Sequence, residues 1–450
     1  MTRSPLPALL AGLILAAPPL AWPEDLLQIY DLAVESDPVL KEAESNLYAT
    51  KEVKPQAKAL LLPNIGIQGE TIYNNIRTSG NTSAGSFTRS DSYVDGAISP
   101  VVTQTVYNRA NWMQLKQTDN TIAQAEALYS NSQVDLMART TSAYFEVLRA
   151  ADAVRVSESL VRANERQLEQ SKQRFEVGLV AITDVNESQA AYDLSRANLI
   201  LAQNAMDNRW EALRKIVGPI NVPLSRLGEK LPLAPPEPND INQWVDAALQ
   251  GNYAIIAAAQ AAEAAKKGIE IQKSGHYPTV AASAGYNWTR SGAEFNTDLD
   301  GAYVGLQVVV PIYEGGAVVS RTRQAGYQLR AAQDQLDQQR RTVTQSVKDA
   351  FRGIISSISD VQARQAAVVS ARSNLESTQA GLEVGTRTQV DVLNAQRALF
   401  QAEFDYLSSR YDYIINGVKL HQATSTLNRD VLAKGNAWLT AQDPVAPPAN

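Results

Sequence analysis

The chain has 450 residues but no cysteine and only two histidines, His276 and His421. Without cysteine it can form no disulfide, no thiolate metal site and no cysteine nucleophile. A zinc site or a histidine-dependent triad would have to be assembled from these two histidines, which lie far apart in the chain. We therefore expect no metal site, no cofactor and no enzymatic activity.

A surplus of positive charge is also missing, because 41 Lys and Arg stand against 47 Asp and Glu. A nucleic-acid-binding protein carries a basic surplus, so we expect no nucleic-acid partner. Apolar residues make up 44% of the chain, but much of this fraction is alanine. That composition favours long exposed helices over one deep core.

Long apolar runs are missing after the first residues. Arg3 and the apolar run from Leu6 to Ala21 have the pattern of a secretory signal peptide, too short and too rich in proline for a membrane-spanning helix. We predict a signal peptide at residues 1–21, with a buried N-terminal helix as the alternative. The exported protein is then either soluble outside the inner membrane or spans a membrane by strands.

The chain contains an internal repeat. The segment "DLLQIYDLAVESDP" from Asp25 aligns with "DINQWVDAALQGNY" from Asp240, and "FEVGLVAITDV" from Phe175 aligns with "LEVGTRTQVDV" from Leu382. Six prolines between the two copies prevent a helix there, and we expect the Pro-rich end from Asp443 to be disordered. The predicted divisions are a first repeat at 22–218, a linker at 219–238, a second repeat at 239–425 and a C-terminal tail at 426–450.

Each repeat begins with a predicted helix, at 25–58 or 240–273, followed by a pair of strands. The strands are predicted from apolar residues that alternate with polar or small ones, the period of a strand. These residues are Ile65, Ile67, Tyr73, Val94, Ile98 and Val102 in the first repeat, and Val280, Ala284, Tyr286, Trp288, Val304, Leu306, Val308, Val310 and Ile312 in the second.

A very long helix follows each strand pair. From Asn108 to Phe175 there is neither proline nor glycine, and apolar or small residues recur at the spacing of a coiled coil. A helix of this length measures ~100 Å at 1.5 Å per residue. It ends at Gly178 or Gly385, and a second helix returns to about Val217 or Ala423.

Four strands per chain are too few to close a barrel. A membrane barrel needs at least about eight strands, and open edges cannot face lipid. If the strands enter a membrane, several chains must therefore share one barrel. Helices that pack along narrow rows of alanine, with their other faces in water, suit a hollow helical tube better than a solid bundle.

With its signal peptide, tandem repeats and the turns "VGLVAITDV" and "VGTRTQVDV", the chain resembles the TolC family of outer-membrane channel-tunnels. The resemblance implies an α+β membrane protein, a homotrimer with a long α-helical coiled-coil tunnel and a shared twelve-stranded transmembrane β-barrel. It implies an exit duct for drug efflux and type I secretion in the outer membrane of a Gram-negative bacterium, in contact with outer-membrane lipid. The implied partners are a periplasmic adaptor and an inner-membrane efflux pump or ABC transporter.

The candidate site residues lie at the two turns. Gly178 and Gly385 fit left-handed glycines that end a helix, and the resemblance makes these turns the tips that contact the adaptor. Thr183 and Asp184 fit an N-cap pair. The resemblance also places them in the lock of the closed entrance.

Arg387 and Asp391 occupy the corresponding turn of the second repeat. They fit an ion pair or a first-turn acid favoured by the helix dipole. The resemblance makes Arg387 a gate-locking residue and Asp391 a ring of carboxylates at the mouth, which attracts cations. The chain departs from the family pattern at Asn394, where a second Asp is common, and at Leu382, where a Tyr is usual.

An exported coiled-coil scaffold or adaptor that never enters a membrane is the alternative interpretation. Such a scaffold has no need of a row of apolar residues facing outward from its strands. The strand pattern therefore favours the channel.

Overall fold

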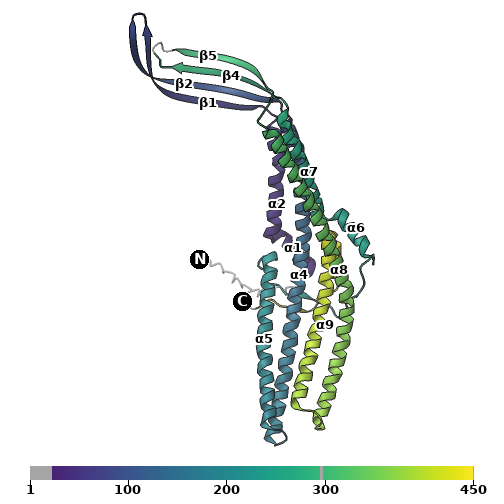
Figure 1. Cartoon of the computed structure of the whole chain (residues 1–450). Helices are drawn as coiled ribbons and strands as arrows, with labels where there is room; N and C mark the ends of the chain where they lie inside the picture. Colours follow the sequence, from purple (N-terminus) through teal and green to yellow (C-terminus); the bar gives the residue numbers. More distant parts are fainter. Residues whose placement is uncertain (1–22, 294–296, 449–450) are drawn as a thin grey trace, which may run out of the picture.

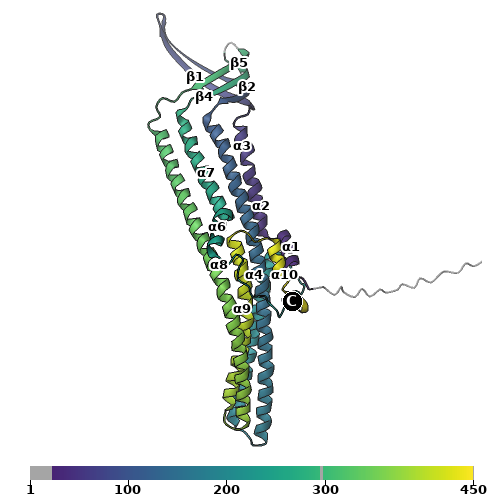
Figure 2. The same ribbon diagram turned by 90° about the vertical axis from the view of Figure 1, so that its right-hand side faces the viewer.

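The computed structural model describes residues 23–293 and 297–448, so the predicted signal peptide lies outside the described residues. The molecule is elongated (Figure 1). A sheet lies at one end, two helical hairpins extend to the other, and shorter elements surround their middle (Figures 1 and 2). The predicted α+β class is confirmed.

The long helices have the predicted positions and lengths. Helix α4 (Arg109–Glu176) has 68 residues and α8 (Ala317–Glu383) has 67, about 100 Å each. Each is followed by an antiparallel return helix, α5 (Ile182–Val217) or α9 (Gln389–Ala423). None of the helices in 23–293 and 297–448 has a stretch that is long and apolar enough to cross a membrane.

The first helix of each repeat is divided, where the sequence predicted one helix. The elements are α1 (Leu26–Ser36), α2 (Pro38–Lys51) and α3 (Val53–Ala59), then α6 (Ile241–Gly251), α7 (Tyr253–Lys273) and the 3₁₀ turn η1 (Ser274–His276). Asp37 has extended backbone, caps the Leu40 amide at 2.9 Å and precedes a proline, which has no amide hydrogen to donate. Asn252 divides α6 from α7 with extended backbone and a side-chain cap on the Ala254 and Ile255 amides, although no proline follows it.

Four antiparallel strands form the sheet in the order β1-β2-β4-β5. They are β1 (Asn64–Thr82), β2 (Gly85–Tyr107), β4 (Thr279–Ser291) and β5 (Asp298–Val309). Ile65 pairs with Val102, Val102 with Ala284, and Ala284 with Val304, so one face carries an apolar row across all four strands. Ile65 is 76% exposed and Val304 is 88% exposed. Among the described residues, the two ends of this row are therefore left uncovered.

The linker and the tail form a second small sheet, β3 (Leu224–Leu227) with β6 (Leu439–Val445). The predicted disorder from Asp443 is wrong for residues 443–445, since Val445 is buried opposite Leu224. Helix α10 (Arg429–Asn436) precedes β6. The Tyr144 hydroxyl of α4 donates to the Ser225 carbonyl of β3 at 2.7 Å, which fixes the linker to the main core.

Candidate functional site

The two helical hairpins turn at one end of the molecule through the same backbone geometry. Gly178 has φ +75° and Gly385 has φ +77°, the left-handed region that glycine enters without steric cost. The amide that follows each glycine reaches back to the last helical turn, from Leu179 to the Arg174 carbonyl and from Thr386 to the Gly381 carbonyl, both at 2.8 Å. These bonds satisfy carbonyls at the helix end that have no partner within the helix. The predicted helix-ending glycines are confirmed.

The first turn differs from its prediction at Thr183 and Asp184. The N-cap of α5 is Ala181, which supplies no side-chain hydrogen bond, and Thr183 and Asp184 already lie inside the first turn. The N-cap interpretation of this pair is therefore wrong. Thr183 is exposed and Asp184 is half-buried, so both remain accessible to a neighbouring chain.

The second turn is capped by side chains. Thr388 is the N-cap of α9, and its hydroxyl accepts from the Asp391 amide at 3.2 Å. The Asp391 carboxylate accepts in return from the Thr388 amide and hydroxyl, both at 2.9 Å. These hydrogen bonds, with the charge of Arg387 as the smallest contribution, lower the pKa of Asp391. Asp391 is thus a first-turn acid that stays ionised at neutral pH.

Arg387 lies beside this cap without pairing to it. Among the residues described, no ion pair joins Arg387 to Asp391, so the ion-pair interpretation is not supported within one chain. Its aliphatic stem instead lies over Gly381: a Cβ built on that glycine would stand 2.6 Å from Arg387 Cγ. The guanidinium is exposed and open to contacts from outside the chain.

The two residues that depart from the family pattern flank this turn. Leu382 is half-buried in the last turn of α8, and Asn394 is exposed one turn after Asp391. A leucine has no hydroxyl to donate or accept at the turn. An asparagine adds no charge near Asp391.

Three buried polar side chains join the hairpins a short distance from the tips. Ser171 of α4 and Ser188 of α5 share a hydrogen bond at 3.0 Å between their hydroxyls. Gln389 of α9 donates from Nε2 to the Ser188 hydroxyl at 3.2 Å. All three are at most 7% exposed. We call these three residues the tip triad.

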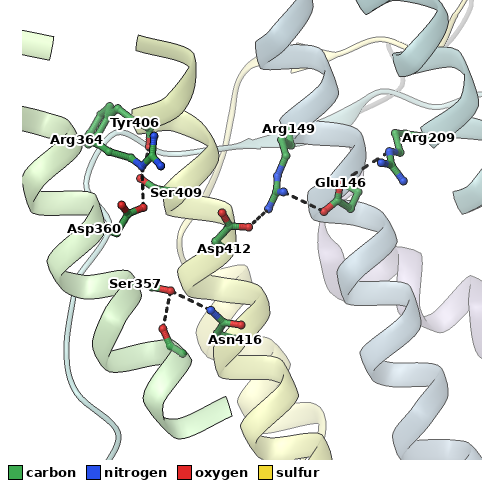
Figure 3. Close-up of polar contacts among 11 residues, drawn as sticks. Glu146, Arg149, Arg209, Ser357, Asp360, Arg364, Tyr406, Ser409, Asp412 and Asn416 are labelled. Atoms are coloured by element: carbon green, nitrogen blue, oxygen red, sulfur yellow. Dashed lines mark hydrogen bonds and ion pairs between the residues drawn. The ribbon is translucent and has the colours of Figure 1, made fainter. Parts of the chain in front are cut away.

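Halfway along the hairpins, a second set of polar contacts joins the same helices (Figure 3). Arg149 of α4 donates to Asp412 of α9 at 2.6 Å and also pairs with Glu146. The Tyr411 hydroxyl donates to the buried Asp152 carboxylate at 2.6 Å. The hairpins are therefore firmly joined at this level, where the main core also lies.

Sequence reasoning missed the tip triad and the N-cap role of Thr388. The cap had a signal, because Thr388 and Asp391 stand three residues apart as in a capping box. The triad had none, since a serine or glutamine on a polar helix looks the same whether it faces water or another helix. Across the described residues, no group of three acidic or histidine side chains is arranged to hold a metal ion.

Known proteins resemble the chain over most of its length. The family model described as Outer membrane efflux protein matches residues 29–219 and 244–426. Outer membrane protein TolC of Vibrio cholerae is 36% identical, with 93% of this chain and 94% of that protein covered. Outer membrane protein TolC of Escherichia coli is 34% identical, with 93% and 86% covered. Alkaline protease secretion protein AprF of Pseudomonas aeruginosa is 27% identical, with 88% and 83% covered.

Solved structures share the fold. The CmeC outer membrane channel of Campylobacter jejuni has a TM-score of 0.77 at 13% identity, with 92% of this chain and 89% of that one covered. The outer membrane protein VceC of Vibrio cholerae has a TM-score of 0.74 at 18% identity, with 89% and 95% covered. The chain therefore belongs to the outer membrane efflux protein family and is located in the outer membrane.

Proposed function

We propose that three copies of this chain form one exit duct that conducts substrates passively from the periplasm to the exterior, serving multidrug efflux and type I secretion. One observation carries the proposal: an uncovered apolar row on a sheet lies about 100 Å from two exposed helical tips in the same chain. A duct that spans two compartments requires a surface that suits lipid and tips that extend far from that surface.

The sheet supports the threefold assembly. Strands β1 and β5 end the sheet on either side, and neither edge has a strand partner within the described residues. Unpaired backbone groups in lipid cost several kcal/mol each. Edge-to-edge pairing of three copies satisfies both edges in a shared twelve-stranded barrel.

The second turn supports an entrance at the opposite end. Arg387 is exposed and has no ion pair among the described residues, so its charge is available to Thr183 and Asp184 of a neighbouring copy. Asp391 of three copies then forms a ring of three carboxylates. Since Asn394 and Leu382 supply neither charge nor hydroxyl, this entrance depends on Arg387 and Asp391.

The tips around Gly178 and Gly385 are the contact surface for a periplasmic adaptor, which links the duct to an inner-membrane pump or ABC transporter. Apolar side chains at these turns support this assignment, because Val177, Leu179 and Val384 are each at least 70% exposed. Exposed apolar clusters mark interaction sites. AprF is named for the secretion of a protease, and the likeness to it supports type I secretion of proteins through the duct of this chain.

The proposal is tested by detergent extraction from outer-membrane fractions, chemical crosslinking and recording in planar bilayers. We expect a trimer that conducts. Recovery of a soluble periplasmic protein would favour the exported scaffold instead, and a detergent-stable monomer with full β content would contradict the shared barrel.

A further inference from the structure

The two hairpins of one chain are joined by few polar contacts. Within the described ranges, the hydrogen bonds and ion pairs between helices α4 or α5 and helices α8 or α9 link four residue pairs. They are Asp135 with Gln422, Arg149 with Asp412, Asp152 with Tyr411, and Ser188 with Gln389. Three of these pairs lie at or above the middle of the hairpins, and the last belongs to the tip triad.

A long stretch in which no described hydrogen bond or ion pair joins the two hairpins separates the middle from the triad. From Asp152 to Ser171 along α4 the distance is about 28 Å at 1.5 Å per residue. A cavity of about 300 Å³ lies in this stretch between α4, α5 and α9, lined by apolar side chains such as Leu160 and Phe404 and by polar ones such as Asn198 and Arg397. The hairpins are therefore loosely packed against each other here.

The triad closes the seam below this cavity. Gln389 is the first residue of α9, next to the cap at Thr388 and two residues from Arg387. Its amide is held against Ser188, which is fully buried, and the second bond of Ser188 to Ser171 fixes that hydroxyl in place. The start of α9 is thus bonded to the first hairpin, within the same chain.

We propose that the Gln389–Ser188 hydrogen bond is an intrachain latch that holds the two hairpins together at the entrance and biases the duct toward its closed state. This inference rests on the proposed duct function and adds a second restraint to it, separate from the exposed charge of Arg387. Because the hairpins remain joined at Arg149 and Tyr411, release of the latch separates their tips and leaves the molecule folded.

The physical reason is the burial of the amide. When Ser188 becomes alanine, Gln389 Nε2 loses its partner in a closed seam where water is excluded, and a buried donor without a partner favours any state that exposes it to water. We expect the open-to-closed ratio to rise by up to about tenfold for each chain of the oligomer, the effect of one lost hydrogen bond.

The experiment records purified oligomers of Ser188→Ala and Gln389→Leu in planar bilayers. Both variants should increase the open fraction or conductance, and the double variant should add little to either one, because both remove the same bond. Combination with Arg387→Ser should multiply the two effects. Ser171→Ala should have a smaller effect, since the Gln389–Ser188 bond remains.

The matched control is Gln189→Leu, one residue along the same helix. Gln189 donates to Asp193 within α5 at 2.9 Å and makes no described bond across the seam. Gln189→Leu removes a side-chain bond that is also donated by a glutamine amide, but an exposed one, and leaves the buried latch in place. If Ser188→Ala behaves like Gln189→Leu while the wild type conducts, the latch is refuted and the duct stands. If the wild type forms no channel, the duct itself fails.

A second measurement protects the test from folding defects. The chain has no natural cysteine, so Ser188→Cys with Gln389→Cys introduces the only thiols. A short bifunctional, reducible thiol reagent should then fix the hairpins together, lower the conductance below that of the wild type and release it on reduction. Unchanged conductance after complete crosslinking would contradict the latch.

Discussion

Gly381 gives a direct test of whether the position of Arg387, and not only its charge, controls the entrance. A Cβ at this residue would stand 2.6 Å from Arg387 Cγ, 3.3 Å from Arg387 Cβ and 3.2 Å from the Thr386 hydroxyl. Gly381→Ala therefore has to displace Arg387 while leaving its charge intact. The contact to Cγ must widen to at least about 3.5 Å.

The magnitude follows from two opposing terms. Alanine in a helix is about 1 kcal/mol more favourable than glycine. Overpacking at a tight contact costs about 1–3 kcal/mol. The turn cannot easily relax, because the Gly381 carbonyl accepts from the Thr386 amide at 2.8 Å and the Arg387 amide at 3.1 Å. We expect a net loss of stability between about 0 and 2 kcal/mol, localised at the turn.

The assay is conductance in planar bilayers beside thermal unfolding of the purified oligomer. Gly381→Ala should raise conductance in the same direction as Arg387→Ser. The control is Gly326→Ala in the same helix, where a Cβ meets nothing within 4 Å, so that variant should gain about 1 kcal/mol and conduct as the wild type. If Arg387→Ser opens the channel and Gly381→Ala does not, the packed position of Arg387 has no role. If neither opens it, Arg387 is an ordinary surface residue.

Three further outcomes are expected. Asp391→Asn should weaken cation selectivity and block by multivalent cations, and Asn394→Asp should strengthen both, because it doubles the number of carboxylates at the mouth. If both variants have the reversal potential of the wild type, Asp391 does not face the lumen. The bonds to Thr388 lower the pKa of Asp391, so the carboxylate is charged above the ordinary aspartate pKa near 3.9 and loses its charge only as pH falls through the lower folded value. Cation selectivity should therefore persist down to about pH 4. Thr388→Ala should move the midpoint of its loss to higher pH. Tyr411→Phe removes the 2.6 Å bond to Asp152, whose side chain is buried, and should cost about 1.5–3 kcal/mol in unfolding experiments, whereas a cost near zero would mean that water replaces the hydroxyl.

The long helices could be predicted closely because their signals are local. A stretch without proline or glycine and a coiled-coil spacing locate both ends of α4 to within one residue. For α8, which contains three glycines, the coiled-coil spacing and Gly385 locate the end of the helix. The divided first helices were missed, although Asp37 followed by proline is a local capping signal. Strand β6 could not be predicted, since its pairing with β3 depends on a contact more than two hundred residues away in the chain.

The site could be predicted only in part, for a similar reason. Gly178 and Gly385 are required by backbone geometry, which the sequence exposes directly. Whether Thr183 caps a helix depends on where the helix begins, and a shift of two residues places it inside α5. Ser188 and Gln389 lie in different repeats, and only the packing of α5 against α9 brings them together.

The two turns share one backbone design but differ in how firmly their side chains hold the return helix. Ala181 leaves the start of α5 without a side-chain cap, whereas Thr388 and Asp391 form a reciprocal cap at the start of α9. A cap of this kind stabilises a helix end by about 1 kcal/mol. The position of Gln389 and Arg387 is therefore set by a rigid turn, and the first hairpin supplies the buried hydroxyl against which the second is held. An entrance built in this way opens by moving α9 as a unit, because unwinding its first turn would break the cap in addition to the latch.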